Sequence, residues 1–195
     1  MANINHKPSK YMLNLLHVLP AFVDDKKEVV NTIVEINSGT LNKYELITET
    51  GTLKLDRVGY SSLAYPATYG AIPGTLDEDG DALDVLIVGV LEPLPAGCLV
   101  EARVIGIMKF IDSGEIDDKI ITVLNDDKRM DHITSLEQLG DHTTKEIQHY
   151  FEHYKDLKKP GLCEVKGFFG KEEAIKTIVD CAKRYQTDYA PKLEA

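Results

Sequence analysis

Two short clusters of aspartates are the part of this chain best suited to chemistry. Asp79, Asp81 and Asp84 lie within six residues of one another, and Asp112 and Asp117 follow in a second cluster. Carboxylates packed this closely repel one another and raise each other's pKa values unless a cation lies among them. Oxygen ligands select hard divalent ions such as Mg²⁺ or Mn²⁺. The two clusters therefore indicate a metal site that holds several ions.

The chain that follows the first cluster favours this interpretation. Asp84–Val90 is an apolar, β-branched run of strand length, which predicts a buried strand with carboxylates at its start. A solvated acidic turn is the plain alternative, because Asp-Gly, as in Asp79-Gly80, is a common turn dipeptide. An EF-hand loop fits poorly, since Ala82 replaces its glycine and Val88 its bidentate glutamate.

Composition bounds the remaining possibilities. The 195 residues are enough for one domain with a substantial core, and the net charge of −10 argues against a nucleic-acid partner. The chain contains no apolar run of membrane-spanning length and its first residues lack a signal-peptide core. Cys98, Cys163 and Cys181 are widely spaced and odd in number, so we expect free thiols in a cytoplasmic protein.

Hydrophobic patterns divide the chain into a β-rich part and a helical part within a single domain, residues 1–195. Tyr11–Leu19 is expected to pack on the surface, and residues 59–80 form a long connection rich in Gly, Pro and Tyr. The expected strands are Val29–Ile36, Tyr44–Thr48, Leu53–Val58, Asp84–Val90, Val100–Lys109 and Ile120–Val123.

Two helices are expected in the last third. Thr143 and Glu146 can form a capping box, after which Ile147, Tyr150, Phe151 and Tyr154 recur at helical spacing. A second helix is predicted from Lys171 to about Tyr185. Short, closely spaced strands followed by helices predict a mainly β fold, an OB-type five-stranded β-barrel with packed C-terminal helices.

Several ordered motifs resemble those of the family I soluble inorganic pyrophosphatases of bacterial type. The segment Asp79-Gly-Asp-Ala-Leu-Asp84 is similar to the family signature, and Ala64–Gly70 resembles its Tyr-Pro-x-x-Tyr-Gly stretch. Further matches are Val34-Glu35-Ile36, Lys43-Tyr44-Glu45, Asp56-Arg57, Asp112 to Lys119, and Phe151 to Leu157. The resemblance covers about residues 28–185 and implies hydrolysis of pyrophosphate by a multi-metal carboxylate site with metal-activated water.

The resemblance also implies a role for each polar residue. Mg²⁺ is the implied cofactor, with several ions per site, and Mn²⁺, Co²⁺ or Zn²⁺ are conceivable substitutes. Asp79, Asp84 and Asp117 would hold a first ion, and Asp84 would also reach a second. Asp112 and Asp117 would bind an ion that arrives with substrate, and Glu35 would bind a last one through water.

The remaining site residues would handle the proton and the phosphates. Asp81 would orient or deprotonate the attacking water. Tyr69 would assist catalysis and contact substrate. The other implied phosphate ligands are Lys43, Arg57, Lys119, Tyr154 and Lys155.

The chain departs from the family pattern in places that carry no active-site charge. Ala82 stands where Pro or Glu is usual, Asp118 replaces a frequent Trp, and Leu162 lies where many members carry Trp. The N-terminal segment is longer and lacks the usual Pro-x-Gly entry. These differences concern loop geometry and rate more than the reaction.

The sequence leaves open two other functions, a zinc hydrolase and a binding module, and it bears on the oligomeric state. His149, Glu152 and His153 fit the motif of inverted zinc metallopeptidases, which predicts a zinc hydrolase. An OB-type barrel without activity could instead be a binding module. Family resemblance places such histidines at a subunit contact, so we expect a homo-oligomer, with a hexamer favoured.

Overall fold

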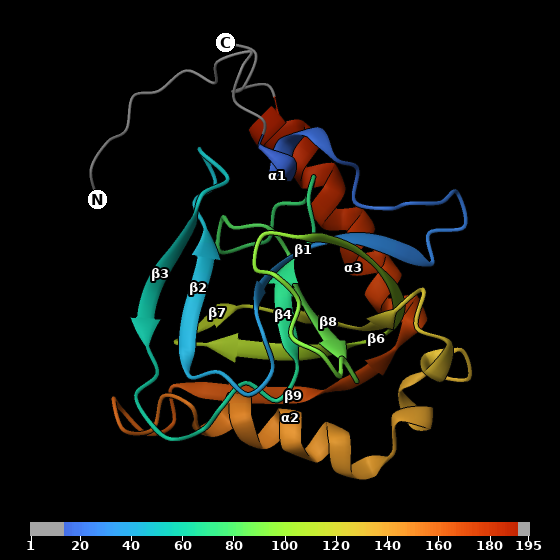
Figure 1. The fold of residues 1–195 in the computed structure, drawn as a ribbon. Coiled ribbons are helices and arrows are strands. Elements are labelled where there is room, and N and C mark those ends of the chain that lie inside the picture. Colours follow the sequence, from blue (N-terminus) through green and yellow to red (C-terminus); the bar gives the residue numbers. More distant parts are fainter. Residues whose placement is uncertain (1–13, 191–195) are drawn as a thin grey trace.

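The computed structural model describes residues 14–190, which form a mainly β fold with helices at its periphery (Figure 1). The strands are β1 (Val29–Ile36), β2 (Asn42–Leu46), β3 (Leu53–Val58), β4 (Thr68–Ala71), β5 (Asp84–Val88), β6 (Leu99–Asp112), β7 (Glu115–Ile116), β8 (Lys119–Leu124) and β9 (Cys163–Gly170). The α-helices are α1 (Leu15–Val18), α2 (Asp141–His153) and α3 (Lys171–Arg184). Short 3₁₀ turns cover Lys128–Met130 and Leu136–Leu139, and a π-helical turn covers Tyr185–Tyr189.

Five strands pair in a closed ring. Its order is β1, β4, β5, β8, β6 and back to β1, and only β5 and β8 run parallel among these pairs. Strand β6 has 14 residues, so its second half extends beyond the ring and pairs with β7 and β9. The expected five-stranded, mainly β architecture is confirmed. Strands β2 and β3 form a separate hairpin beside the ring.

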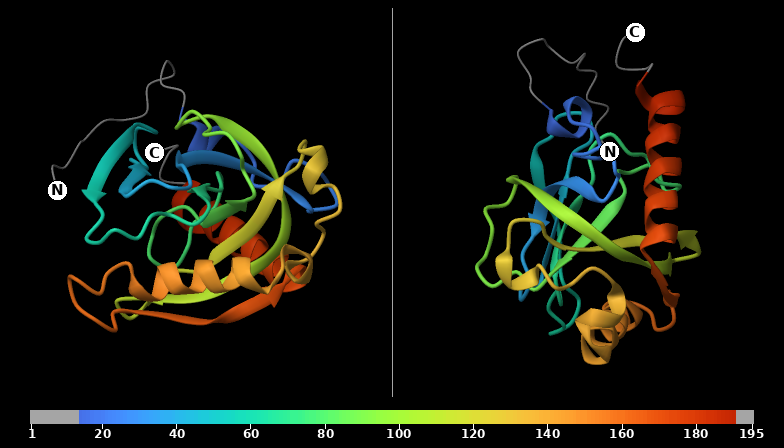
Figure 2. Two further views of the ribbon diagram at one scale, coloured as in Figure 1. Left: turned by 60° about the horizontal axis from the view of Figure 1, so that its bottom comes forward. Right: turned by 90° about the vertical axis from the view of Figure 1, so that its right-hand side faces the viewer.

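The ring is covered on two sides, which explains why its strands are apolar on both faces. One core cluster joins Leu86 and Ile121 to Tyr150 and Phe151 of α2. A second cluster joins residues of the opposite faces of the same strands to α3. Figure 2 shows α2 running across one end of the ring while α3 lies along its flank. In β5 the three central residues are all buried, as the apolar run after Asp84 predicts.

Two tight turns carry the aspartate clusters. Ser113 and Gly114 both have positive φ, 56° and 96°, as the two central residues of a type I′ hairpin turn require. This turn pairs Asp112 with Glu115 and fixes Asp112 at the end of β6. The turn Asp77–Asp81 is called the acidic turn below. Gly80 lies in it between Asp79 and Asp81 with φ of 94°, where a side chain would be strained.

The N-terminal segment connects distant parts of the chain. Leu16 of α1 is buried against Ile33 and Ala71. His17 stacks with Tyr185 and Tyr189, with ring centres 5.9 and 5.1 Å apart, and its Nδ1 lies 2.8 Å from the Tyr185 hydroxyl. Its Nε2 lies 2.7 Å from the Thr48 carbonyl oxygen in the β2–β3 turn, so Nε2 donates this bond. The start of the described chain thus fastens the hairpin to the C-terminal helix.

The structure extends and shifts the elements expected from the sequence. All six expected strands exist, although the second begins two residues earlier, at Asn42. Strand β4 lies inside the expected connection 59–80, and β7 and β9 were not anticipated. The helices at α2 and α3 are confirmed, and Ile147, Tyr150 and Phe151 are buried as their spacing predicts. Of the segment Tyr11–Leu19, residues 11–13 lie outside the described range.

The expected capping box at Thr143 is wrong. Helix α2 begins earlier, at Asp141 after Gly140, so Thr143 lies within its first turn. There the Thr143 hydroxyl donates to the Leu139 carbonyl at 3.2 Å instead of capping a backbone amide. A capping box does form nearby, between Ser135 and Gln138. Among residues 14–190, we find no helix with the length and apolarity needed to cross a bilayer.

Candidate active site

A cavity of about 730 Å³ lies where the β2–β3 hairpin faces the ring. Eleven of the twelve residues singled out from the sequence line it, and they come from β1, β2, β3, β4, the acidic turn, β5, β6, β8 and the end of α2. These are Glu35, Lys43, Arg57, Tyr69, Asp79, Asp81, Asp84, Asp112, Asp117, Lys119 and Tyr154. The twelfth, Lys155, is not a lining residue but bonds to Asp112, which is one. The fold therefore brings all twelve to one place.

The centre of the site is a buried lysine between two aspartates. Parallel pairing of β5 and β8 sets Asp84 directly opposite Lys119. The Lys119 Nζ lies 2.5 Å from Asp84 Oδ2 and also bonds to Asp117, although the residue is only 1% exposed. Burial opposes the charge, but Asp84 and Asp117 raise the pKa of the Lys119 ammonium. Tyr69 donates its hydroxyl to the same Asp84 oxygen.

A second group surrounds Asp112. Its Oδ2 accepts from the Tyr154 hydroxyl at 2.8 Å and from the Lys155 ammonium. The Cys163 thiol lies 3.7 Å from its other oxygen. Although burial opposes the change, hydrogen bonds from Lys155, Tyr154 and Ser113 lower the pKa of Asp112 to about 2. Asp112 is therefore an anion over the whole neutral range.

Three of the carboxylates singled out from the sequence have no basic partner among the described residues. Within residues 14–190, no ion pair joins Glu35, Asp79 or Asp81 to a lysine, arginine or histidine. Burial, and then repulsion from Asp84, raises the pKa of Glu35 to about 8. Partial loss of solvation in the cavity, and then repulsion from Asp79 and Asp84, raises the pKa of Asp81 to about 6, although its side chain stays accessible to solvent. Glu35 is therefore largely protonated at neutral pH, and an added cation would displace its proton.

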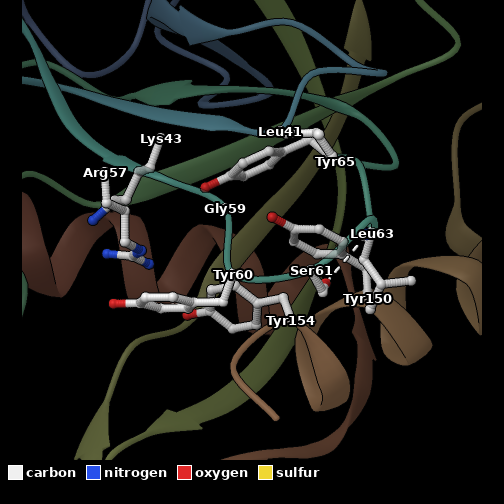
Figure 3. A pocket seen from close by; sticks show the side chains of 10 residues that line it. All are labelled: Leu41, Lys43, Arg57, Gly59, Tyr60, Ser61, Leu63, Tyr65, Tyr150 and Tyr154. Carbon is white, nitrogen blue, oxygen red and sulfur yellow. Dashed lines mark hydrogen bonds between the residues drawn. The ribbon is translucent and has the colours of Figure 1, made fainter. Parts of the chain in front are cut away.

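The hairpin supplies cations on the opposite wall. Lys43 and Arg57 are paired across β2 and β3, so both side chains leave the same part of the hairpin. Figure 3 shows them at a small cavity whose lining also includes four tyrosines, Tyr60, Tyr65, Tyr150 and Tyr154. The Arg57 guanidinium lies 5.9 Å from the ring centres of Tyr60 and Tyr154. Arg57 also bonds to Asp56 at 2.7 Å, which orients its fork.

The donor set fits divalent cations of the hard type. Eight acidic and four basic side chains line the main cavity, so the acids outnumber the bases before any anionic substrate enters. Every acidic ligand offers oxygen, the donor that Mg²⁺ and Mn²⁺ prefer. Within residues 14–190, no three acidic, histidine or cysteine side chains already stand close enough to hold one ion. Lys119 lies between Asp84 and Asp117 instead.

Sequence reasoning missed three residues that the site uses. Tyr65 lines both cavities, and Glu45 and Asp56 lie 3.4 and 3.8 Å from the Lys43 ammonium. All three stand inside segments already matched to motifs, next to residues that were assigned roles. The sequence signal that could have identified them is proximity in the chain: Glu45 follows Lys43 by two residues, Asp56 adjoins Arg57, and Tyr65 precedes Tyr69 in the same motif.

Asp118, a departure from the family pattern, points away from the cavity. Its carboxylate accepts from the Phe110 amide at 3.1 Å and from the Lys109 ammonium at 2.8 Å. Lys109 in turn reaches Thr177 of α3 at 3.2 Å. Asp118 therefore fixes the β8 start to β6 and α3, and leaves its neighbours Asp117 and Lys119 in the cavity.

The histidines of α2 do not assemble a zinc site. His149 and His153 have ring centres 4.8 Å apart. However, Glu152 accepts from Gln148 at 2.9 Å, and His153 Nδ1 lies 2.8 Å from Asp156 Oδ2. Glu152 and His153 thus bond to side chains within four residues of them in the chain. Among the described residues, the third ligand that the zinc interpretation needs is not brought to them.

Comparison with known proteins adds independent evidence. The family model described as inorganic pyrophosphatase matches residues 32–186. An inorganic pyrophosphatase of Bacillus sp. (strain PS3) is 45% identical over 160 residues, which are 82% of this chain and 96% of the relative. The crystal structure of an inorganic pyrophosphatase from Neisseria gonorrhoeae superposes with a TM-score of 0.83 at 42% identity, over 87% of this chain and 98% of that one. The Thermus thermophilus inorganic pyrophosphatase gives 0.82 at 40% identity, over 89% and 99%.

The buried lysine yields a test of the site's electrostatics. Lys119→Met keeps the side-chain length but leaves Asp84 and Asp117 side by side without their cation. Breaking a buried pair in this way costs about 3–5 kcal/mol, so the metal-free protein should unfold at clearly lower urea concentration. Lys166→Met is the matched control, because Lys166 pairs with Glu164 at the surface, where such pairs contribute about 0–1 kcal/mol. Equal losses in the two variants would contradict the interpretation.

Proposed function

Since this chain belongs to the inorganic pyrophosphatase family and is an enzyme that hydrolyses inorganic pyrophosphate, we propose that it works through several divalent ions, Mg²⁺ foremost, held by the carboxylates of its cavity. The observation that carries this proposal is the convergence of twelve charged and phenolic residues from across the chain on one cavity with an excess of acids. Pyrophosphate is itself a compact anion. Cations must therefore offset the charge of both substrate and site.

We assign the proposed ligands from the family motifs that these cavity residues match. Asp79, Asp84 and Asp117 would hold one ion, with Asp84 shared with a second, and Asp112 with Asp117 would hold a further ion. Glu35 would hold a last ion through water, which agrees with its buried place on β1. When bound, such ions neutralise phosphate charge and make water ionise near neutral pH. Mn²⁺, Co²⁺ or Zn²⁺ offer the same chemistry as substitutes.

The protein's own groups complete the reaction. Asp81 is exposed at the acidic turn and free of basic partners, so it can orient the attacking water and take its proton. Lys43 and Arg57 bind phosphate oxygens from the hairpin wall, and Lys119 and Lys155 from the opposite wall. Tyr69 and Tyr154 donate hydrogen bonds and keep bulk water from the reacting phosphates. Burial, and then Asp84 and Asp117, hold the pKa of Tyr69 well above its usual value, so it remains a donor.

Location and assembly are further parts of the proposal. Cys98, Cys163 and Cys181 are free, as expected for a protein of the reducing cytoplasm. A homo-oligomer, with a hexamer favoured, is supported by the outer face of α2. There His149 lines a surface hollow of about 510 Å³ together with the apolar residues Leu63, Ala64 and Pro66.

The first test is activity itself. Purified protein with millimolar Mg²⁺ should release orthophosphate from pyrophosphate, and excess EDTA should abolish the release because it removes the ions that offset charge. A phosphate-release assay measures both. Readdition of Mg²⁺ should restore activity, and a failure with Mg²⁺, Mn²⁺, Co²⁺ and Zn²⁺ alike would refute the proposal.

A second test separates the roles of two neighbouring aspartates. Asp81→Asn should keep much of the tight Mg²⁺ binding but lose most turnover at neutral pH, because the amide cannot take a proton. Asp84→Asn should weaken Mg²⁺ binding itself, since it removes charge shared between ions. Titration calorimetry and steady-state kinetics measure the two effects. If both variants bind Mg²⁺ equally badly, the division of roles is wrong.

A third test concerns assembly. Light scattering at pH 5–8 should show a homo-oligomer whose size falls in mild acid, because paired histidines of a subunit contact repel once both are protonated. His153→Ala should remove that acid sensitivity or weaken the assembly. His132→Ala, outside α2, is the control. A monomer at every pH rejects the oligomer, and an unaltered, pH-insensitive assembly rejects the role of the histidines.

A further inference from the structure

The last residue of α3 contacts the acidic turn from behind. Arg184 touches three consecutive residues that immediately precede Asp79. Its Nη1 donates to the Leu76 carbonyl at 2.8 Å and lies 3.7 Å from Asp77 Oδ1, while its Nη2 lies 3.5 Å from Glu78 Oε1. A guanidinium presents five N–H donors in a rigid planar fork, whereas a lysine ammonium presents three from one nitrogen.

The same end of α3 binds this segment a second time. The Leu76 amide donates to the Cys181 carbonyl at 3.1 Å, and the Cys181 thiol donates to Asp77 Oδ1 at 3.5 Å. Helix α3 is itself anchored, since Ala174 and Ile178 are fully buried against the ring. The segment before Asp79 is therefore attached to a rigid support.

Asp77 transmits this attachment to the site. Its amide donates to the Asp81 carbonyl at 2.7 Å, and its carbonyl accepts from the Gly80 amide at 3.2 Å. Asp77 is thus the base of the turn whose tip presents Asp79 and Asp81. Both aspartates are exposed, and no basic side chain among the described residues holds them. Their placement depends on how the turn's base is held.

We propose that Arg184 is a positioning residue, which fixes the base of the acidic turn and so places Asp79 and Asp81 for cation binding. The inference rests on the proposed function, because it takes the cation to be Mg²⁺. For the loss of Arg184, the positioning role and simple electrostatics predict opposite changes in Mg²⁺ affinity. Removing a positive charge near a cation site should strengthen cation binding, whereas loosening the turn should weaken it.

The experiment measures Mg²⁺ binding by titration calorimetry on the metal-stripped full-length protein. Arg184→Gln should bind Mg²⁺ roughly 10-fold more weakly, the usual scale for losing a group that orients metal ligands. Lys183→Gln removes the same charge from the adjacent, exposed position, and should bind as the wild type does. Arg184→Lys keeps the charge but loses the planar fork, so its Mg²⁺ affinity should fall between those of Arg184→Gln and the wild type.

The outcomes distinguish the positioning role of Arg184 from the Mg²⁺-dependent function on which it rests. Wild-type binding with equal or tighter binding by Arg184→Gln overturns the positioning role alone. A wild type that binds no Mg²⁺ overturns the proposed function and this inference with it. Circular dichroism establishes that each variant is folded. Should Arg184→Gln fail to fold, Arg184→Lys decides the matter, and wild-type affinity in that variant overturns the inference.

Discussion

A charged lysine with almost no access to water is the constraint on which the rest of the structure depends. Lys119 is stabilised only because Asp84 and Asp117 lie within bonding distance of its ammonium. Parallel pairing of β5 and β8 creates this arrangement, since it sets Asp84 and Lys119 at the same level. A slip of one strand by one residue would turn its side chain, Asp84 or Lys119, to the opposite face, among the apolar residues under α3. The apolar residues that follow Asp84 in β5 and Lys119 in β8 therefore fix the register of these two strands.

The site concentrates charge that the fold must compensate. Buried carboxylates cost stability unless they are paired or protonated, and the raised pKa values of Glu35 and Asp81 show both burial and mutual repulsion. Asp84, Asp112 and Asp117 are already bound to lysines. Glu35, Asp79 and Asp81 have no such partner among the described residues and can receive cations from solution. The ring is closed and has a core cluster on each face, which gives a rigid frame for such an unfavourable group of charges.

Much of this could be predicted from the sequence, for identifiable reasons. The run after Asp84 is apolar on both faces and so marks a buried strand, and the motifs around Asp79, Asp112 and Tyr154 lie in the expected order. Strand β4 was missed because it has four residues and includes Gly70, so no period is visible. Strand β9 has Lys166 and Gly167 at its centre, and only pairing with β6 makes it a strand. No local pattern could show that Lys119 is buried while its neighbour Asp118 points to α3.

The bond between His17 and Tyr185 joins residues 168 positions apart. During synthesis, the β2–β3 hairpin and the acidic turn are made long before the helix that supports them. A nascent chain that has completed β9 already has every strand of the ring, yet its hairpin turn lacks the Tyr185 attachment and its acidic turn lacks Arg184. Translation of the final helix and the turn after it therefore adds the last support to a cavity whose lining is already made, and a chain truncated before it would present the strands of the enzyme without that support.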